Sequence, residues 1–137
     1  MSRRAHIETL LRKAAQDELA LDLLLQHGAM PEELVGFHAQ QAAEKLLKAA
    51  LRTVGADYPL THRIERLMDL LAEAGSSTPS DLDELRLLTP FAVEFRYDIL
   101  PSEAEATLDG HRLRGLIAQL RQWVEALSAP DAEDAEG

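Results

Sequence analysis

Residues 37–51 read FHAQQAAEKLLKAAL, and this stretch decides the fold because it is an uninterrupted helical pattern with two distinct faces. Its apolar residues recur at steps of three and four, as a helix that faces a core requires. Gln40, Glu44 and Lys48 follow one another at steps of four, so they stack along a neighbouring face. We call the polar side chains of this helix the polar ridge, which comprises Gln40, Gln41, Glu44, Lys45 and Lys48.

The same helical period continues on both sides of this stretch and predicts further helices. Gly28 and Gly55 are expected to end the first two helices, and Thr61 is expected to cap the third. No run alternates with period two, as a half-buried strand would. The first two expected helices cover residues 3–27 and 31–54, and a third carries Ile64–Leu71. A fourth follows Thr78 and keeps its register through Phe95 across a kink at Pro90; a break there, with Thr89 as a new cap, is the alternative. A fifth opens with Pro101 and the capping box Ser102-x-x-Glu105 and continues to Leu127.

Length and composition indicate one helical domain. A chain of 137 residues suits a single core, and Leu and Ala favour helix. The absence of cysteine excludes disulfides and thiolate metal sites. No apolar run is long enough to cross a bilayer and no signal peptide is visible, so we expect a cytoplasmic protein without membrane contact. We therefore expect an all-α antiparallel bundle of about five helices over residues 1–128, and a disordered acidic tail over residues 129–137.

The formal net charge of −10 argues against sequence-blind binding of nucleic acid, which is driven by cations that neutralise phosphates. The tail contributes part of that charge, but the expected bundle is still acidic. A local contact with an anion stays open, because several cations lie close together in the sequence. These are Lys45, Lys48, Arg52, Arg63 and Arg66.

Four segments, in their order along the chain, resemble one family. FHAQQAAEKLLKAAL is followed by Asp57-Tyr58-Pro59, then by Leu60-Thr61-His62, and later by Phe95-Arg96-Tyr97-Asp98. This series is similar to the HEPN domain, the "higher eukaryote and prokaryote nucleotide-binding" family, from the first helix to about Leu127. The resemblance implies an up-and-down helical bundle. It does not fix an activity, because the family includes ribonucleases and members without known catalysis.

Arg96 is the sharpest candidate that this resemblance supplies. In HEPN ribonucleases an arginine opens an R-x(4–6)-H motif, in which the arginine steadies the phosphorane charge and the histidine moves a proton. Counted from Arg96, the histidine would fall at Pro101, Ser102 or Glu103, and none of these is histidine. The incomplete motif argues against an enzyme. Arg96 is then a structural ion-pair residue or a contact to a ligand or partner.

Tyr97 and Asp98 follow this arginine directly. A tyrosine near the motif is the modified residue in some members that are paired with a nucleotidyltransferase, but here a packing role with a bonded hydroxyl is favoured. An alternative is that the chain is a metal-independent ribonuclease toxin centred on Arg96. Another acid–base group would then replace the missing histidine of the motif: Asp98, Glu103, His62 or His111.

The polar ridge has three interpretations. It is a solvated face on which Glu44 and Lys48 form a helical ion pair worth about 0.2–0.5 kcal/mol. It is an intramolecular lock in which Gln41 or Glu44 meets Arg96 or the turn at His62. In the third interpretation the ridge contacts a ligand directly, through Gln41, Glu44, Lys45 and Lys48. His62 itself is favoured as a structural hydrogen-bonding residue over a catalyst.

The leading hypothesis is an interaction module without catalysis of its own, because the ribonuclease motif is incomplete, and the resemblance implies that it is a homodimer. The resemblance also implies a companion, a small nucleotidyltransferase-domain protein encoded nearby in a toxin–antitoxin-like pair, and a nucleotide or RNA phosphate as the candidate ligand. No metal or cofactor motif is found. Two alternatives stay open: the ribonuclease toxin centred on Arg96, and a structural helical adaptor that binds only protein.

Overall fold

A computed structural model describes residues 2–28, 31–92 and 108–128, and this part of the chain is helical with no strand. It confirms the predicted all-α bundle. The fourth of the expected helices is a 3-10 helix rather than an α-helix. The elements are α1 (Arg3–His27), α2 (Glu32–Thr53), α3 (Ile64–Glu73), η1 (Ser80–Phe91) and α4 (Gly110–Ser128).

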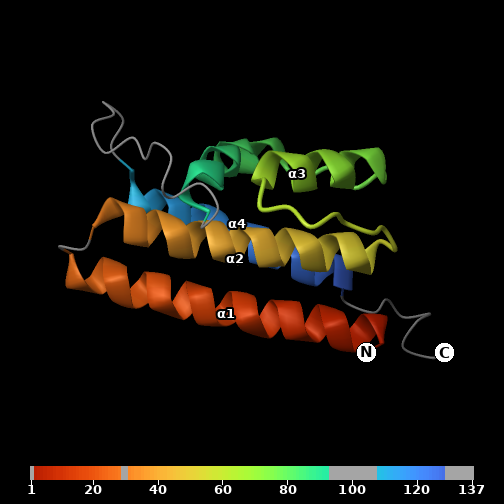
Figure 1. Cartoon of the computed structure of the whole chain (residues 1–137), viewed down its shortest axis with the longest axis horizontal. Helices are drawn as coiled ribbons and strands as arrows, with labels where there is room; N and C mark the ends of the chain where they lie inside the picture. Colours follow the sequence, from red (N-terminus) through yellow and green to blue (C-terminus); the bar gives the residue numbers. More distant parts are fainter. Residues whose placement is uncertain (1, 29–30, 93–107, 129–137) are drawn as a thin grey trace.

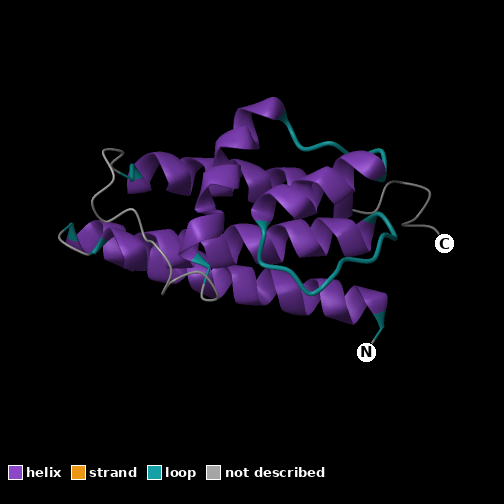
Figure 2. Cartoon of the chain, turned by 45° about the horizontal axis from the view of Figure 1, so that its top comes forward, coloured by secondary structure: helices purple, strands orange, loops and turns teal. Residues whose placement is uncertain are grey.

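The helix α2 lies at the centre of the bundle. Figure 1 shows α1 running antiparallel beside it, with α4 behind it and α3 and η1 above it. Residues 54–63 form a connection without helix that doubles back along α2 before α3 begins, and Figure 2 shows it as a long teal loop. We call residues 54–63 the return segment.

The first two helices begin and end within one residue of the predicted positions. The hydroxyl of Ser2 accepts a hydrogen bond from the backbone N–H of Ala5 at 3.1 Å, which caps α1. Gly28 ends α1 with a φ of 82°, and Gly55 follows α2 with a φ of 81°. Only glycine adopts this left-handed conformation at little cost, so these two residues define the ends.

The start of α3 differs from the prediction. Thr61 does not cap it: Arg63 occupies the cap position, and the Thr61 hydroxyl accepts a hydrogen bond from the Arg63 N–H at 3.1 Å. The first free N–H of the helix, that of Ile64, instead donates to the hydroxyl of the buried Thr89 at 3.0 Å. The cap of α3 is therefore supplied by η1, a contact between elements that local sequence does not reveal.

A fourth helix occupies the predicted place, but its predicted continuation through a kink at Pro90 is wrong. The element is a 3-10 helix that ends at Phe91, one residue after Pro90, and Ala92 is extended with a ψ of 150°. Its inward residues, Leu82, Leu85 and Leu88, are spaced by three, which matches the three residues per turn of a 3-10 helix. The predicted continuation through Phe95 lies outside the described residues.

The predicted fifth helix starts later than expected. Leu108 and Asp109 are not helical, and α4 begins at Gly110. The Asp109 carboxylate accepts a hydrogen bond from the Arg112 N–H at 3.0 Å, which is the geometry of an N-cap. The proposed capping box at Ser102-x-x-Glu105 lies outside the described residues. The predicted apolar stripe is confirmed, with Leu113, Leu116, Ile117, Leu120 and Val124 all buried.

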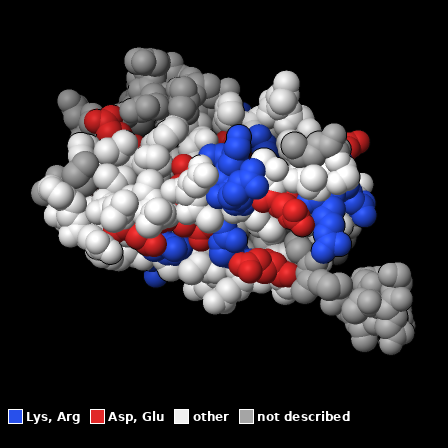
Figure 3. All heavy atoms as spheres, turned by 90° about the horizontal axis from the view of Figure 1, so that it is seen from below, with Lys and Arg blue, Asp and Glu red and all other residues white. Residues whose placement is uncertain are grey.

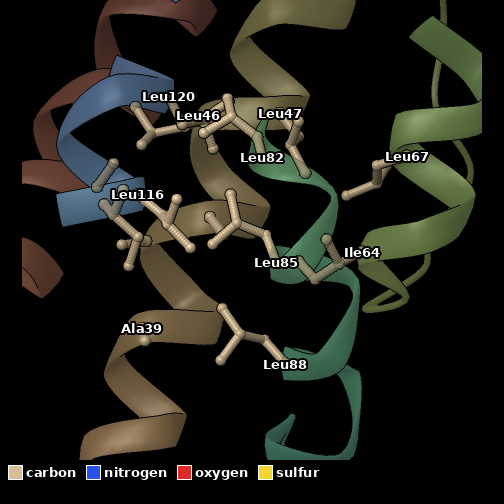
Figure 4. Packing of buried hydrophobic residues seen from close by; sticks show 14 of the residues in the cluster. Ala39, Leu46, Leu47, Ile64, Leu67, Leu82, Leu85, Leu88, Leu116 and Leu120 are labelled. Carbon is tan, nitrogen blue, oxygen red and sulfur yellow. The ribbon is translucent and has the colours of Figure 1, made fainter. Parts of the chain in front are cut away.

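The core lies between α2 and the elements around it. Figure 4 shows Leu46 and Leu47 of α2 among leucines that η1 and α4 contribute. At one point the approach requires glycine: a Cβ on Gly36 would lie 2.4 Å from Cδ1 of Phe91. The missing side chain lets the end of η1 pack directly on the α2 backbone.

A second junction joins α1 to α4 through charged groups. Glu18 is only 5% exposed, and its carboxylate accepts hydrogen bonds from Arg121 Nε at 2.8 Å and Nη2 at 2.6 Å. Arg121 Nη2 also donates to the carbonyl of Leu11 at 3.0 Å. Arg114 completes the group by pairing with Asp22 at 2.6 Å. Because the carboxylate is buried with bonded partners, these contacts fix where α4 lies along α1.

Candidate functional site

The return segment brings the polar ridge into contact with His62. These residues are separated along the chain by the second half of α2 and by the return segment itself, which runs back beside that helix (Figure 1). The side-chain amide of Gln40 donates to the backbone carbonyl of His62 at 3.0 Å. His62 Nδ1 lies 2.9 Å from Oε1 of Glu44. The return segment is therefore fixed to α2 by the ridge.

Glu44 is the centre of this arrangement. Its Oε2 accepts a hydrogen bond from Lys48 Nζ at 2.8 Å. Its Oε1 accepts one from Gln40 Nε2 at 2.9 Å and faces His62 at the same distance. The residue is only 5% exposed, so its charge depends on these partners.

The environment of Glu44 keeps its carboxylate ionised. Burial acts to raise the pKa of this group, because it removes water from the charged form. Hydrogen bonds from Lys48, Gln40 and His62 outweigh burial and hold the pKa of Glu44 below its usual value of 4.5. A carboxylate of this kind does not accept a proton near neutral pH, so it is suited to holding structure rather than to general acid catalysis.

The ridge continues toward α1. Gln41 Nε2 donates to Gln40 Oε1 at 2.7 Å, and Lys45 Nζ donates to Gln41 Oε1 at 3.3 Å. Lys45 also forms a short ion pair with Asp17 of α1. The second oxygen of Asp17 lies 3.1 Å from His38 Nδ1. A chain of contacts thus runs from the return segment across α2 to α1.

At its other end the ridge meets an aromatic ring. Lys48 Nζ lies 5.3 Å from the ring centroid of Tyr58, within the range of a cation–π contact. The Tyr58 hydroxyl lies 2.6 Å from Nε2 of His6, at the start of α1. Three elements are therefore connected through Lys48 and Tyr58.

These positions separate the three interpretations of the ridge. A solvated face is wrong for Gln40 and Glu44, because both side chains are buried. The contact between Glu44 and His62 is one of the four pairings that the lock interpretation allowed. The two pairings with Arg96 are untested, because Arg96 lies with Tyr97 and Asp98 outside the described residues.

Several residues of this network were not predicted. Asp17, His38 and His6 each contact an element distant in sequence, and a single helical pattern does not show such pairings. The polar type of Asp17 within a helix that packs on α2 was the only available signal. No group of His, Asp and Glu that could hold a metal occurs among residues 2–28, 31–92 and 108–128.

His111, one of the proposed replacement acid–base groups, is exposed in the first turn of α4. His62, the other histidine of that set, is held on Glu44. Glu103 lies outside the described residues. Within the described ranges no helix is long and apolar enough to cross a membrane.

Comparison with known proteins gives one clear result. Neither the curated proteins nor the solved structures include a significant match to the chain. The model of the HEPN domain family matches residues 7–127, which covers all of the helices described above except the ends of α1 and α4. The chain therefore belongs to the HEPN domain family, a family of nucleotide-associated helical modules.

Proposed function

We propose that this protein is a homodimeric interaction module that works with a small nucleotidyltransferase-domain protein, in a toxin–antitoxin-like pair in the cytoplasm, and has no catalysis of its own. The absence of catalysis is proposed from the incomplete R-x(4–6)-H motif at Arg96, and the polar ridge supports a structural role for its own face of α2. Each of its five side chains is bonded to another side chain, and the central carboxylate stays ionised. Groups in this state hold helices together and are not poised to transfer protons.

The surface of α1 supports association with another protein surface. Leu19 and Leu23 are 59% and 57% exposed, and their spacing of four places them on one side of the helix. Seen from the α1 side, the part of the surface over the C-terminal half of this helix carries few charged groups, whereas blue and red atoms gather toward its N-terminal half (Figure 3). Adjacent exposed leucines of this kind favour a protein interface. HEPN domains often dimerise, so a second copy is the first occupant to test.

The oligomeric state tests the dimer directly. Sedimentation equilibrium of the wild-type chain is expected to give twice the monomer mass of 15.2 kDa. A Leu23→Glu variant is expected to give a monomer, because it places a charge within the interface. Leu87→Glu is the matched control: Leu87 is 70% exposed but lies on η1, away from α1. A wild-type chain that sediments as a monomer at all concentrations would refute the dimer.

The absence of catalysis is tested with RNA. Purified protein incubated with RNA and a metal chelator is expected to leave the RNA intact. The alternative, a metal-independent ribonuclease, predicts cleavage that an Arg96→Ala variant loses. A His62→Ala variant tested beside it would show whether the histidine on Glu44 serves as the replacement base. Cleavage by the wild type that either variant abolishes would reverse the proposal.

The partner is tested by the neighbouring gene and by co-purification. We expect an adjacent reading frame with the Gly-Ser…Asp-x-Asp signature of a nucleotidyltransferase. Its product, co-expressed with this chain, is expected to elute with it as one complex. Separate elution of the two proteins at micromolar concentration would instead favour the adaptor alternative with another protein partner.

A further inference from the structure

An open hollow of about 260 Å³ lies where the start of α1 meets the end of α2 and the return segment. Four residues line it: His6, Arg52, Asp57 and Tyr58. Three of them carry groups that can donate hydrogen bonds, namely an imidazole, a guanidinium and a phenol. The hollow is thus rich in donors although the whole chain has a net charge of −10.

Arg52 is incompletely satisfied at this place. Its Nη1 donates to Asp57 Oδ1 at 3.0 Å, but its Nε is buried and has no hydrogen-bond partner among the described residues. A buried donor without a partner is costly. The one carboxylate that holds the guanidinium is 97% exposed, and exposed ion pairs of this kind are weak. A stronger anion can therefore replace Asp57 and draw the guanidinium into a geometry that also satisfies Nε.

Tyr58 and His6 are the other two donors among the lining residues. The Tyr58 hydroxyl lies 2.6 Å from His6 Nε2, so the two side chains form one hydrogen-bonded unit. Burial raises the pKa of Tyr58 above its usual value of 10.0, the charge of Glu44 acts in the same direction and that of Arg52 opposes it. The phenol therefore keeps its proton at neutral pH and can act as a donor.

A further cation lies near the hollow, because Lys48 Nζ is 5.3 Å from the ring centroid of the lining residue Tyr58. The nearby carboxylates are those of Asp57 and Glu44. Because the Glu44 carboxylate is already bound to Lys48, Asp57 is the carboxylate among the described lining residues that competes with an incoming anion.

We propose that this hollow binds a phosphate group, with the Arg52 guanidinium and the Tyr58 hydroxyl as its donors, while the Tyr58 oxygen accepts a hydrogen bond from His6 Nε2. A guanidinium matches phosphate oxygens with two parallel N–H bonds, which a chloride ion cannot use. The site lies at one end of the bundle and needs neither a second copy nor a partner, so the inference does not rest on the function proposed above. The phosphate can be a free ion or part of a nucleotide, since the hollow is open.

The full chain titrated with inorganic phosphate, at ionic strength held constant with chloride, tests the site. Two-dimensional NMR is expected to show saturable shifts at His6, Tyr58 and the Arg52 Nε–H signal. Arg52→Gln is expected to weaken binding about tenfold, because it removes a charged donor. Tyr58→Phe keeps the ring and is expected to weaken binding by a similar factor of about ten.

Asp57→Asn is the most informative variant, because its expected effect is a gain in affinity for phosphate. Asp57 is almost fully exposed, so its replacement leaves the fold intact, and removal of the competing carboxylate is expected to tighten phosphate binding about threefold. Arg66→Gln is the matched control: Arg66 is a half-exposed arginine on α3, and its loss is expected to leave the affinity unchanged.

Two nucleoside ligands distinguish the sources of the phosphate. Adenosine monophosphate and adenosine are titrated in parallel with inorganic phosphate. Tighter binding of the monophosphate than of phosphate, with none of adenosine, assigns the site to a nucleotide phosphate, whereas equal affinity of the two phosphates assigns it to the free ion. Absence of saturable shifts at Arg52 overturns the proposal. So does a loss of affinity in Arg66→Gln as large as that in Arg52→Gln.

Discussion

Oε1 of Glu44 lies 2.9 Å from Nδ1 of His62, and this contact joins the middle of α2 to the end of the return segment. The same oxygen accepts a hydrogen bond from Gln40, whose amide also holds the His62 carbonyl. Side chain and backbone of His62 are thus bound by one pair of α2 residues. The start of α3 is positioned by this contact, since α3 begins at Ile64.

Replacement of Glu44 by glutamine is expected to destabilise the fold strongly. The variant keeps the size of the side chain but leaves Lys48, whose side chain is only 12% exposed, without its countercharge. Because an unpaired buried charge is costly, we expect the free energy of unfolding in urea to fall by about 3 kcal/mol. Glu73→Gln is the control, because that glutamate pairs with Arg66 at the exposed surface and is expected to contribute less than about 1 kcal/mol. Equal losses in the two variants would contradict the buried role of Glu44.

Stability is expected to fall in acid because of the same carboxylate. The pKa of Glu44 in the folded protein is below its usual value of 4.5. The folded state therefore holds this proton more weakly than the unfolded state does, and stability is lost as the pH falls below about 4.5 through the folded pKa. Urea unfolding between pH 7 and pH 3 measures this loss. The Glu44→Gln variant is expected to show a shallower pH dependence than the wild type, and parallel curves would show that other groups dominate.

Gly36 is expected to tolerate no side chain. A Cβ at this position would lie 2.4 Å from Cδ1 of Phe91, so Gly36→Ala forces η1 away from α2. We expect the free energy of unfolding to fall by about 1–3 kcal/mol, as in other overpacked cores. Gly115→Ala is the control within a helix, because nothing lies within 4 Å of its added Cβ. That variant is expected to raise stability by about 0.5–1 kcal/mol, since alanine favours helix. A stabilised Gly36→Ala variant would show that Phe91 moves aside freely.

The planar guanidinium of Arg121 is expected to be required for full stability at the junction of α1 and α4. Arg121→Lys keeps the charge but cannot bind the Glu18 carboxylate and the Leu11 carbonyl together. We expect thermal and urea unfolding to show a loss of about 2 kcal/mol. The matched substitution Arg112→Lys, at a mostly exposed pair with Glu84, is expected to change stability by less than about 0.5 kcal/mol. If Arg112→Lys lowers the free energy of unfolding as much as Arg121→Lys does, the burial of Glu18 does not strengthen its ion pair.

The sequence predicts the helices whose ends are marked by local chemistry. Gly28 and Gly55 end α1 and α2 where expected, because a left-handed backbone favours glycine whatever the rest of the fold is. The start of α4 could also have been found, since Asp109 precedes Gly110 as a cap. The longer pattern that begins at Pro101 obscured this signal, because a proline followed by a capping box predicts a helix start as well as Asp109 does.

Other features depend on contacts between elements. The cap of α3 comes from Thr89, which is distant in sequence from Ile64. Asp17 meets Lys45 and His38 only because α1 packs against α2. The type of η1 was missed for another reason: Leu82, Leu85 and Leu88 fit a period of three, but one step of an α-helix is also three. Only a run of steps of three without any step of four distinguishes the two helices.

The return segment has a consequence for how this protein can change over evolution. One residue inserted into the first half of α2 would rotate the rest of the helix by about 100° relative to α1, and would turn Lys45 away from Asp17. An extra residue near Leu60, which is fully exposed, would only bulge into solvent while His62 stays on Glu44. Natural length variation among related chains should therefore gather in this connection and spare the helix beneath it.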